Sequence, residues 1–211
     1  SYDPMTLLVL HEMLHEAGLP AGVAQCLTGR GSVVGDLLVD DPRIACVNFT
    51  GSTDAGLSIA ATAAKHLTDY KFELGGNDPF IVFEDADMDL VVKEAEDQAR
   101  NNRQCCTGSK RFLVHNSLKE EFIRRLGAEL DKLVIGDPMD PAVNMGPMIA
   151  ERAAKQVEKQ VELTVAQGAR IVRGGKRSGA FYEPTILADV TLDMDIARDM
   201  EVFGPVWPVI G

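Results

Sequence analysis

Two short runs in the chain carry residue types that could do chemistry. The run Gln104-Cys105-Cys106-Thr107 places adjacent thiols in a polar loop, and Glu73-Leu74-Gly75-Gly76 places one carboxylate beside two glycines. A thiol nucleophile served by a carboxylate base is the combination that covalent thiol catalysis uses. By residue type alone, the thiols are better explained as inert core groups and Glu73 as a structural carboxylate. Only the fold could bring the two runs together.

Length and composition narrow the class of protein. With 211 residues and 45% hydrophobic content, the chain can bury the core of one or two domains. A net charge of −11 argues against nucleic acid or an anionic membrane surface as a partner. No apolar run reaches the roughly 18 residues of a membrane span, and no signal peptide is indicated. We therefore expect a soluble cytoplasmic protein.

The cysteines and histidines do not indicate a disulfide scaffold or a metal site. Four cysteines, two of them adjacent, are too few for a disulfide framework at this length, and we interpret them as reduced thiols. The histidines show no ligand spacing and are expected to be structural or surface residues; they are His11, His15, His66 and His115.

Hydrophobic periodicity predicts alternating helices and strands. Helices are expected at residues 5–16, 55–67, 117–133 and 149–167, with a further one capped by Asp87. Strands or extended segments are expected at residues 44–49, 70–74, 80–83, 111–115, 171–172, 182–187 and 201–206. This order predicts an α/β fold with mainly parallel sheets.

Two glycine-containing turns could bind a phosphate. The pattern Gly29, Gly31, Gly35 would let backbone N–H groups approach an anion, although such spacing is common by chance. Gly51 and Ser52 lie between a predicted strand and an alanine-rich helix, the arrangement that presents a helix N-terminus to an anion. An ordinary N-cap by Ser52 or Thr53 explains the second turn equally well.

Five motifs occur together in an order that resembles the aldehyde dehydrogenase superfamily. They are Phe49-Thr50-Gly51-Ser52-Thr53, Glu73-Leu74-Gly75-Gly76, Asp85-Ala86-Asp87, residues 101–106 and Glu201-Val202-Phe203-Gly204-Pro205. The run ELGGNDPFIVF at residues 73–83 and Tyr182-Glu183-Pro184-Thr185 look most similar to succinate-semialdehyde dehydrogenases. The resemblance implies parts of two open, parallel-sheet, Rossmann-like domains. Residues 1–73 would be the C-terminal part of a dinucleotide-binding domain, and residues 74–211 the N-terminal part of a catalytic domain.

The resemblance also implies site residues. Cys106 would be the nucleophile, because the family's thiol lies two positions after the glutamine, and Glu73 would activate the water that releases the product. Arg100 would face the carboxylate of the substrate. NAD or NADP would be held by Gly29, Gly31, Gly35, Gly51, Ser52, Leu74, Glu201 and Phe203.

The chain departs from the family in the segment around the thiol motif and in its length. Arg103 stands where family chains usually carry glycine, and the helix between Asp85 and Gln104 is one residue shorter than expected. Family members are also longer at both ends, so the chain looks like an internal piece. We expect it to be inactive alone and its full-length parent to be a homo-oligomer.

The expected function is NAD(P)-dependent oxidation of a small-molecule aldehyde to an acid through a cysteine thiohemiacetal and thioester, with succinate semialdehyde favoured. One alternative releases the thioester to coenzyme A; the presence of Glu73 argues against it. A second alternative is a non-catalytic fragment or a redox-sensing pair, Cys105 and Cys106.

Overall fold

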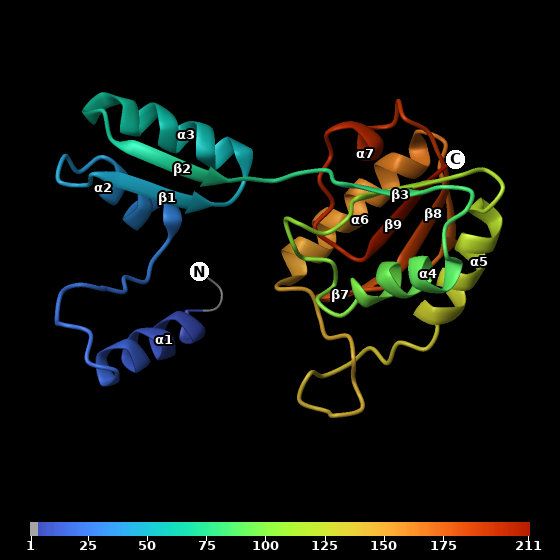
Figure 1. Ribbon diagram of the computed structural model, residues 1–211, viewed down its shortest axis with the longest axis horizontal. Coiled ribbons are helices and arrows are strands. Elements are labelled where there is room, and N and C mark those ends of the chain that lie inside the picture. The colour runs from blue at the N-terminus through green and yellow to red at the C-terminus, as the bar shows by residue number, and fades with distance from the viewer. Residues whose placement is uncertain (1–3) are drawn as a thin grey trace. The chain divides into compact units, whose positions relative to one another are not determined.

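The computed structural model describes residues 4–211 and divides into two compact units, one up to Gly75 and one from Gly76 to Gly211. Figure 1 shows both units, each of which is described here by itself. The division falls two residues beyond Glu73, where the sequence suggested a boundary. Both units combine helices with parallel strands, as the alternating pattern predicted.

The first unit is a small βα layer. Its elements are α1 (Met5–Glu16), a π-helical turn η1 (Gly31–Gly35), α2 (Asp36–Val39), β1 (Cys46–Thr50), α3 (Thr53–Ala63), a 3₁₀ turn η2 (Ala64–His66) and β2 (Asp69–Glu73). Strands β1 and β2 are parallel, and α3 connects them. Ser52 caps α3, since its hydroxyl accepts a hydrogen bond from the Ala55 N–H at 3.3 Å. The N-cap interpretation of this turn is therefore confirmed.

Two helical segments of the first unit show where pattern and structure diverge. Helix α1 has the predicted bounds, yet none of its residues is buried against the described chain. The glycine-rich segment after residue 29 is a helical turn rather than an open loop, because Gly31 to Gly35 continue directly into α2.

The second unit is a larger α/β layer. It contains β3 (Pro79–Val82), α4 (Met88–Asp97), β4 (Arg111–Val114), α5 (Lys119–Leu130), α6 (Glu151–Ala166), β5 (Arg170–Arg173), β6 (Arg177–Ser178), β7 (Phe181–Tyr182), β8 (Thr185–Val190), α7 (Asp195–Arg198) and β9 (Val206–Ile210). Its main sheet has the order β3-β4-β9-β8-β5. Neighbouring strands run parallel except β5, which is antiparallel to β8.

Helices cover both faces of this sheet, so the central strands β8 and β9 are buried on both sides. On one face α4 and α5 pack side by side over Phe112, Ile186 and Trp207 (Figure 1). On the other face α6 and α7 cover Leu187, Val206 and Ile210. Adjacent residues of β8 and β9 thus point to opposite cores, as the two-residue period of a strand requires.

The predicted helices and strands of this unit are present with shifted ends. Asp87 caps α4 as predicted, with its carboxylate accepting from the N–H groups of Asp89 and Leu90. Residues 201–205 of the predicted extended segment belong to no helix or strand, and only Val206 is part of a strand, the first residue of β9. Helix α7 was not predicted, because four residues are too few to show a helical period.

Candidate active site

Two predicted site segments reach the same edge of the second unit's sheet. The thiol loop precedes β4, and residues 201–205 precede β9, which is the parallel neighbour of β4. Segments that enter adjacent parallel strands arrive at the same edge. Gln104 to Thr107 and Glu201 to Phe203 therefore meet on one side of the sheet although they are far apart in sequence.

The loop that leads to the thiols makes an unusual turn. Asn102 and Arg103 both adopt the left-handed region, with φ of 57° and 53°. Non-glycine residues visit this region seldom, and Asn more readily than Arg. The Asn102 side chain stabilises the turn by donating to the carbonyl oxygens of Gly146 and Pro147 at 3.0 and 3.2 Å. Sequence reasoning missed Asn102, because no local pattern connects it to residues more than forty positions away.

Arg103 is buried beneath the loop. Its side chain is 2% exposed, and its guanidinium lies 4.9 Å from the ring of Phe112 and 4.7 Å from that of Trp207. One of its nitrogens donates to the Val206 carbonyl. Burial lowers the pKa of Arg103 to about 9, which still leaves it charged at neutral pH. The arginine that replaces the family's usual glycine is thus a core residue that joins the loop to β9.

Gln104 fixes the other side of the loop. Its side-chain oxygen accepts from the Ile149 N–H at 3.0 Å, and its side-chain nitrogen donates to the Asn101 carbonyl at 3.1 Å. The loop and residues 146–149 line an open, shallow cavity of about 490 Å³. Arg100 lies in its wall.

Arg100 is available to a ligand only in competition with a neighbour. Its side chain is 67% exposed, and its Nη2 lies 3.3 Å from Asp97 Oδ1. An exposed ion pair of this kind contributes roughly 0–1 kcal/mol, so a substrate carboxylate could replace Asp97 at little cost. The cavity wall is consistent with either a substrate-binding or a surface role for Arg100.

The two thiols are half-buried and differ in their surroundings. Cys105 Sγ lies 3.1 Å from the Thr107 hydroxyl. This hydrogen bond and the Thr107 backbone N–H lower the pKa of Cys105 below its usual value. Cys106 is the thiol that the motif selects, and the structure places it beside Cys105 on the same loop.

Glu201 and Phe203 lie at the sheet edge, where only some of the hydrogen-bonding groups of Glu201 have partners among the described residues. Glu201 Oε1 is buried and accepts no hydrogen bond from the described residues, while its backbone carbonyl accepts from Gln160. Phe203 is 42% exposed. A buried carboxylate oxygen without a donor fits a ligand hydroxyl, which is the group that a nicotinamide ribose would offer.

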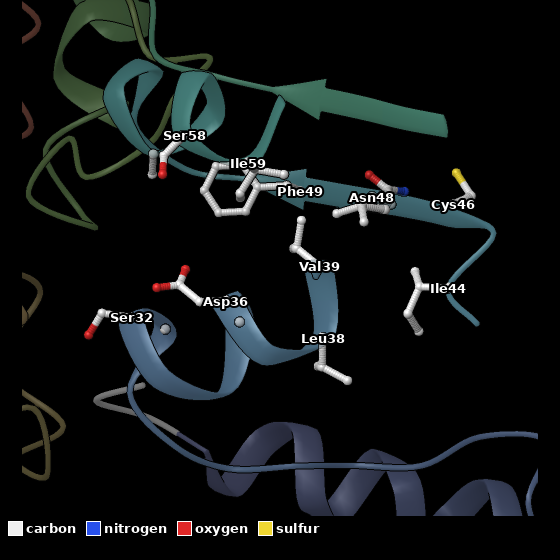
Figure 2. A pocket seen from close by; sticks show the side chains of 14 residues that line it. Ser32, Asp36, Leu38, Val39, Ile44, Cys46, Asn48, Phe49, Ser58 and Ile59 are labelled. Atoms are coloured by element: carbon white, nitrogen blue, oxygen red, sulfur yellow. The ribbon is translucent and has the colours of Figure 1, made fainter. Parts of the chain in front are cut away.

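The first unit contains a pocket of about 740 Å³ between η1, α2, β1 and α3 (Figure 2). Figure 2 shows Ser32 and Asp36 on one wall and Phe49, Ser58 and Ile59 on the opposite wall. Gly31 and Gly35 line this pocket, and a Cβ added to either would meet no atom within 4 Å. Their missing side chains leave room for a ligand to approach the backbone, so the pocket fits a dinucleotide.

The other residues of this unit that were predicted to bind the cofactor, Gly29, Gly51 and Ser52, lie in closely packed turns. A Cβ on Gly29 would lie 2.3 Å from Val34, and one on Gly51 would lie 2.4 Å from the Phe49 ring. A side chain at either position would displace the neighbouring side chain whether or not a ligand binds. The Gly51 N–H also donates to the Glu73 carbonyl at 3.0 Å, which fixes the turn that Ser52 caps.

Glu73 and Leu74 lie at the end of the first unit. Glu73 is the last residue of β2 and is exposed. The Leu74 side chain packs against α3, since a Cβ added to Gly56 would lie 2.8 Å from its Cδ2. The backbone of this segment continues directly into the second unit.

The chain combines two α/β units with parallel strands, one with a glycine-lined pocket and the other with adjacent thiols in a loop at a sheet edge. The sequence model of the aldehyde dehydrogenase family matches residues 1–211 of this chain. The chain belongs to this family.

Relatives with different substrates in their names match almost the whole chain. The succinate-semialdehyde dehydrogenase [NADP(+)] of Escherichia coli is 39% identical over 99% of this chain and 44% of its own length. A betaine aldehyde dehydrogenase of Cereibacter sphaeroides is 41% identical over 98% of this chain and 43% of its own length. The chain thus spans less than half the length of these curated relatives.

Solved structures confirm the fold. The crystal structure of an E. coli NADP-dependent enzyme matches with a TM-score of 0.93 and 39% identity, over 98% of this chain and 44% of that one. A Staphylococcus aureus betaine aldehyde dehydrogenase in complex with NAD+ matches with a TM-score of 0.93 and 35% identity, over 99% and 43%. The α/β fold predicted from the sequence is therefore confirmed.

Two kinds of feature are absent from residues 4–211. No helix in this range is long and apolar enough to cross a membrane. No group of three or more His, Cys, Asp or Glu side chains in this range is arranged to hold a metal ion.

Proposed function

We propose that the protein containing this chain oxidises an aldehyde to a carboxylic acid with NAD or NADP, using Cys106 as the nucleophile. The observation that carries the proposal is the meeting of the thiol loop with residues 201–203 at one sheet edge. Relatives whose names specify succinate semialdehyde and betaine aldehyde as substrates support the reaction class.

The Cys106 thiol performs the covalent step. A free thiol is only a few per cent thiolate at neutral pH, so it must be activated before it attacks the aldehyde carbon. The attack gives a tetrahedral thiohemiacetal whose oxyanion the Cys106 backbone N–H would stabilise. A bound NAD or NADP would supply the acceptor for the hydride that leaves the thiohemiacetal carbon. The thioester left on Cys106 is then hydrolysed by a water molecule from which Glu73 takes a proton.

Residues of both units would hold the cofactor. Gly31 and Gly35 leave open space in the pocket of the first unit, where Gly29, Gly51 and Ser52 shape the surrounding turns. Glu201 would accept a hydrogen bond from a ribose hydroxyl, beside Phe203. Leu74 would line the nicotinamide pocket through its backbone. Residues 1–73 would then belong to a dinucleotide-binding domain and residues 74–211 to a catalytic domain.

The proposed substrate is a small aldehyde that carries a carboxylate, with succinate semialdehyde favoured. Support comes from Arg100 in the wall of the 490 Å³ cavity, because a guanidinium pairs bidentately with a carboxylate. We also propose that the complete protein is homo-oligomeric and, as the sequence pattern led us to expect, cytoplasmic.

The decisive experiment compares two cysteine variants of the complete gene product. Cys106→Ser should abolish NAD(P)H formation from aldehyde, while Cys105→Ser should retain most of it. Glu73→Gln should release one burst of NAD(P)H per site and then slow steady turnover by roughly a hundredfold or more, because acylation precedes its step. Full activity of Cys106→Ser would refute the assignment of the nucleophile.

A redox-sensing role is a second candidate, favoured by the lowered pKa of Cys105 next to a second thiol. A sensor would oxidise with peroxide and ignore aldehyde, whereas a dehydrogenase thiol is acylated in an aldehyde-dependent way. Peptide mapping after each treatment separates the two. Addition of coenzyme A tests the third candidate, since an acyl-CoA product would replace the free acid.

A further inference from the structure

Lys110 lies almost completely buried next to the thiol loop. Its side chain is 4% exposed, and its Nζ donates a hydrogen bond to the Cys105 carbonyl at 2.7 Å. The same ammonium lies 4.6 Å from the ring centroid of Phe203. Lys110 therefore touches both segments that meet at the sheet edge.

The Lys110 ammonium lies among charged groups, but its hydrogen bond goes to an uncharged carbonyl. Glu201 and Asp78 attract the ammonium and Arg103 repels it. Burial is the largest cause of the lowered pKa of Lys110, and the positive charge of Arg103 lowers that pKa further. The direct hydrogen-bond partner of the buried ammonium is thus a neutral carbonyl.

This carbonyl belongs to the peptide group that carries the Cys106 N–H. In a trans peptide, the C=O of one residue and the N–H of the next point in opposite directions, and no described peptide bond is cis. The Gly108 N–H donates to the same Cys105 oxygen at 3.3 Å, so two donors hold it. No carbonyl within residues 4–211 accepts a hydrogen bond from the Cys106 N–H. That N–H is left free, on the side opposite to Lys110.

We propose that Lys110 is a positioning residue that aims the Cys106 N–H at the oxyanion by holding the Cys105 carbonyl. This inference rests on the proposed function and adds a residue to it. Phe203 restricts the ammonium through a cation–π contact, so the segment that contacts the cofactor also supports the peptide that stabilises the oxyanion.

Two thiol reagents separate positioning of the N–H from other roles of Lys110. Acylation of Cys106 by p-nitrophenyl acetate passes through a tetrahedral oxyanion when the thiolate adds to the carbonyl and p-nitrophenolate leaves. Alkylation by iodoacetamide displaces iodide directly and forms no oxyanion. Neither reaction requires an aldehyde or a cofactor, so the test is independent of dehydrogenase turnover.

The expected result is a change in the ratio of the two rates. In the complete gene product, Lys110→Met should slow ester acylation of Cys106 by about tenfold or more, since loss of one oxyanion donor typically costs about 10²–10³-fold. Alkylation should stay within about twofold. Lys110→Arg keeps a charged donor and should restore most of the acylation. Lys132→Met removes an equal charge from an exposed site and should change neither rate.

Several outcomes would overturn the inference. Equal slowing of both reactions would show that Lys110 acts on the thiolate, and no slowing would show that the carbonyl contact is dispensable. A wild-type protein that is alkylated but not acylated would show that no working oxyanion donor is present. If Lys110→Met does not fold, Lys110→Gln, which keeps a polar group at the buried site but loses the charge, gives the same comparison.

Discussion

The guanidinium of Arg103 and the indole of Trp207 lie 4.7 Å apart beneath the thiol loop. Trp207 is itself fixed, since its indole N–H donates to the Ala95 carbonyl at 2.9 Å. Helix α4, the loop and β9 are thus connected through two stacked side chains. Arg103 also leaves its Nε and Nη2 without partners among the described residues, so its burial carries a desolvation penalty.

The first prediction concerns Arg103, whose side-chain volume should stabilise the fold and whose buried charge should destabilise it. Arg103→Ala should lower the free energy of unfolding by about 2–4 kcal/mol, because it leaves a cavity between two aromatic rings. Arg103→Met fills much of that volume without a charge, and should be close to neutral or stabilising, because replacing a buried charge by an apolar group often is. Urea denaturation of both variants measures the difference. Equal destabilisation by Met and Ala would show that the cation–π contacts and the hydrogen bond to Val206 dominate.

The second prediction concerns the pocket of the first unit. Gly35 has helical φ and ψ of −64° and −49°, and its missing side chain would point into open space. Gly35→Leu should therefore preserve or slightly raise stability, since leucine favours helix more than glycine does, by about 1 kcal/mol. It should weaken binding of NADH and NADPH at least tenfold by filling the pocket.

Calorimetric titration of the complete gene product checks this prediction. Ala61→Leu is the matched control, because Ala61 is an exposed position on α3 outside the pocket lining. Unchanged cofactor affinity in Gly35→Leu would remove the pocket in Figure 2 from the cofactor site.

Local physics explains which parts of the fold the sequence could predict. Asp87 was readable as a cap because a carboxylate three residues before an apolar helix face has one common role. Helix α1 was predicted with the correct bounds from its apolar spacing and from the Gly18 and Pro20 that follow it. Both predictions need only neighbours within one or two helical turns.

The parts that could not be predicted depend on contacts between distant segments. An arginine at φ 53° is unexpected on backbone preference, and only the rings of Phe112 and Trp207 explain why it is tolerated. No local pattern singles out Lys110, since its contact with Phe203 spans about ninety residues and arises from the pairing of β4 with β9. The thiols themselves were identified by the motif, and the structure adds their surroundings rather than their roles.

The third prediction is a pH dependence at Tyr182. Burial raises the pKa of Tyr182 to about 12, while an unfolded tyrosine ionises near 10, so the folded protein holds this proton more tightly. The resulting stabilisation is complete below about pH 10 and is lost as the pH rises towards 12. Thr185 interacts with the hydroxyl and lowers its pKa, but the contact falls short of normal hydrogen-bond geometry, so Tyr182→Phe should be nearly neutral at pH 7.

Denaturation of wild type and Tyr182→Phe at pH 8, 10 and 11.5 isolates this residue from other titrating groups. The wild type should lose about 1–2 kcal/mol relative to the variant between pH 10 and 11.5, a value reduced for partial solvent screening. A constant difference across this range would mean that Tyr182 ionises as freely in the folded state as in the unfolded state.

The last prediction is the substrate class, which depends on Arg100 and its neighbour Asp97. If Arg100 binds the acid group of succinate semialdehyde, Arg100→Ala should lower kcat/KM for that substrate by about 1.5–3 kcal/mol, the usual value of a hydrogen bond to a charged group. Butyraldehyde, which lacks the carboxylate, should be almost unaffected. Arg124→Ala, at an exposed position on α5, serves as the control.

Substitution of Asp97 should improve the use of succinate semialdehyde, whereas substitution of Arg100 should impair it. Its carboxylate lies 3.3 Å from Arg100 and would compete with the substrate for the guanidinium. Asp97→Asn should therefore lower KM for succinate semialdehyde by a few-fold, since an exposed ion pair contributes at most about 1 kcal/mol, and should leave butyraldehyde unchanged. Equal effects of Arg100→Ala on both aldehydes would instead show that Arg100 supports the loop, and the substrate would then be an aldehyde without a required carboxylate.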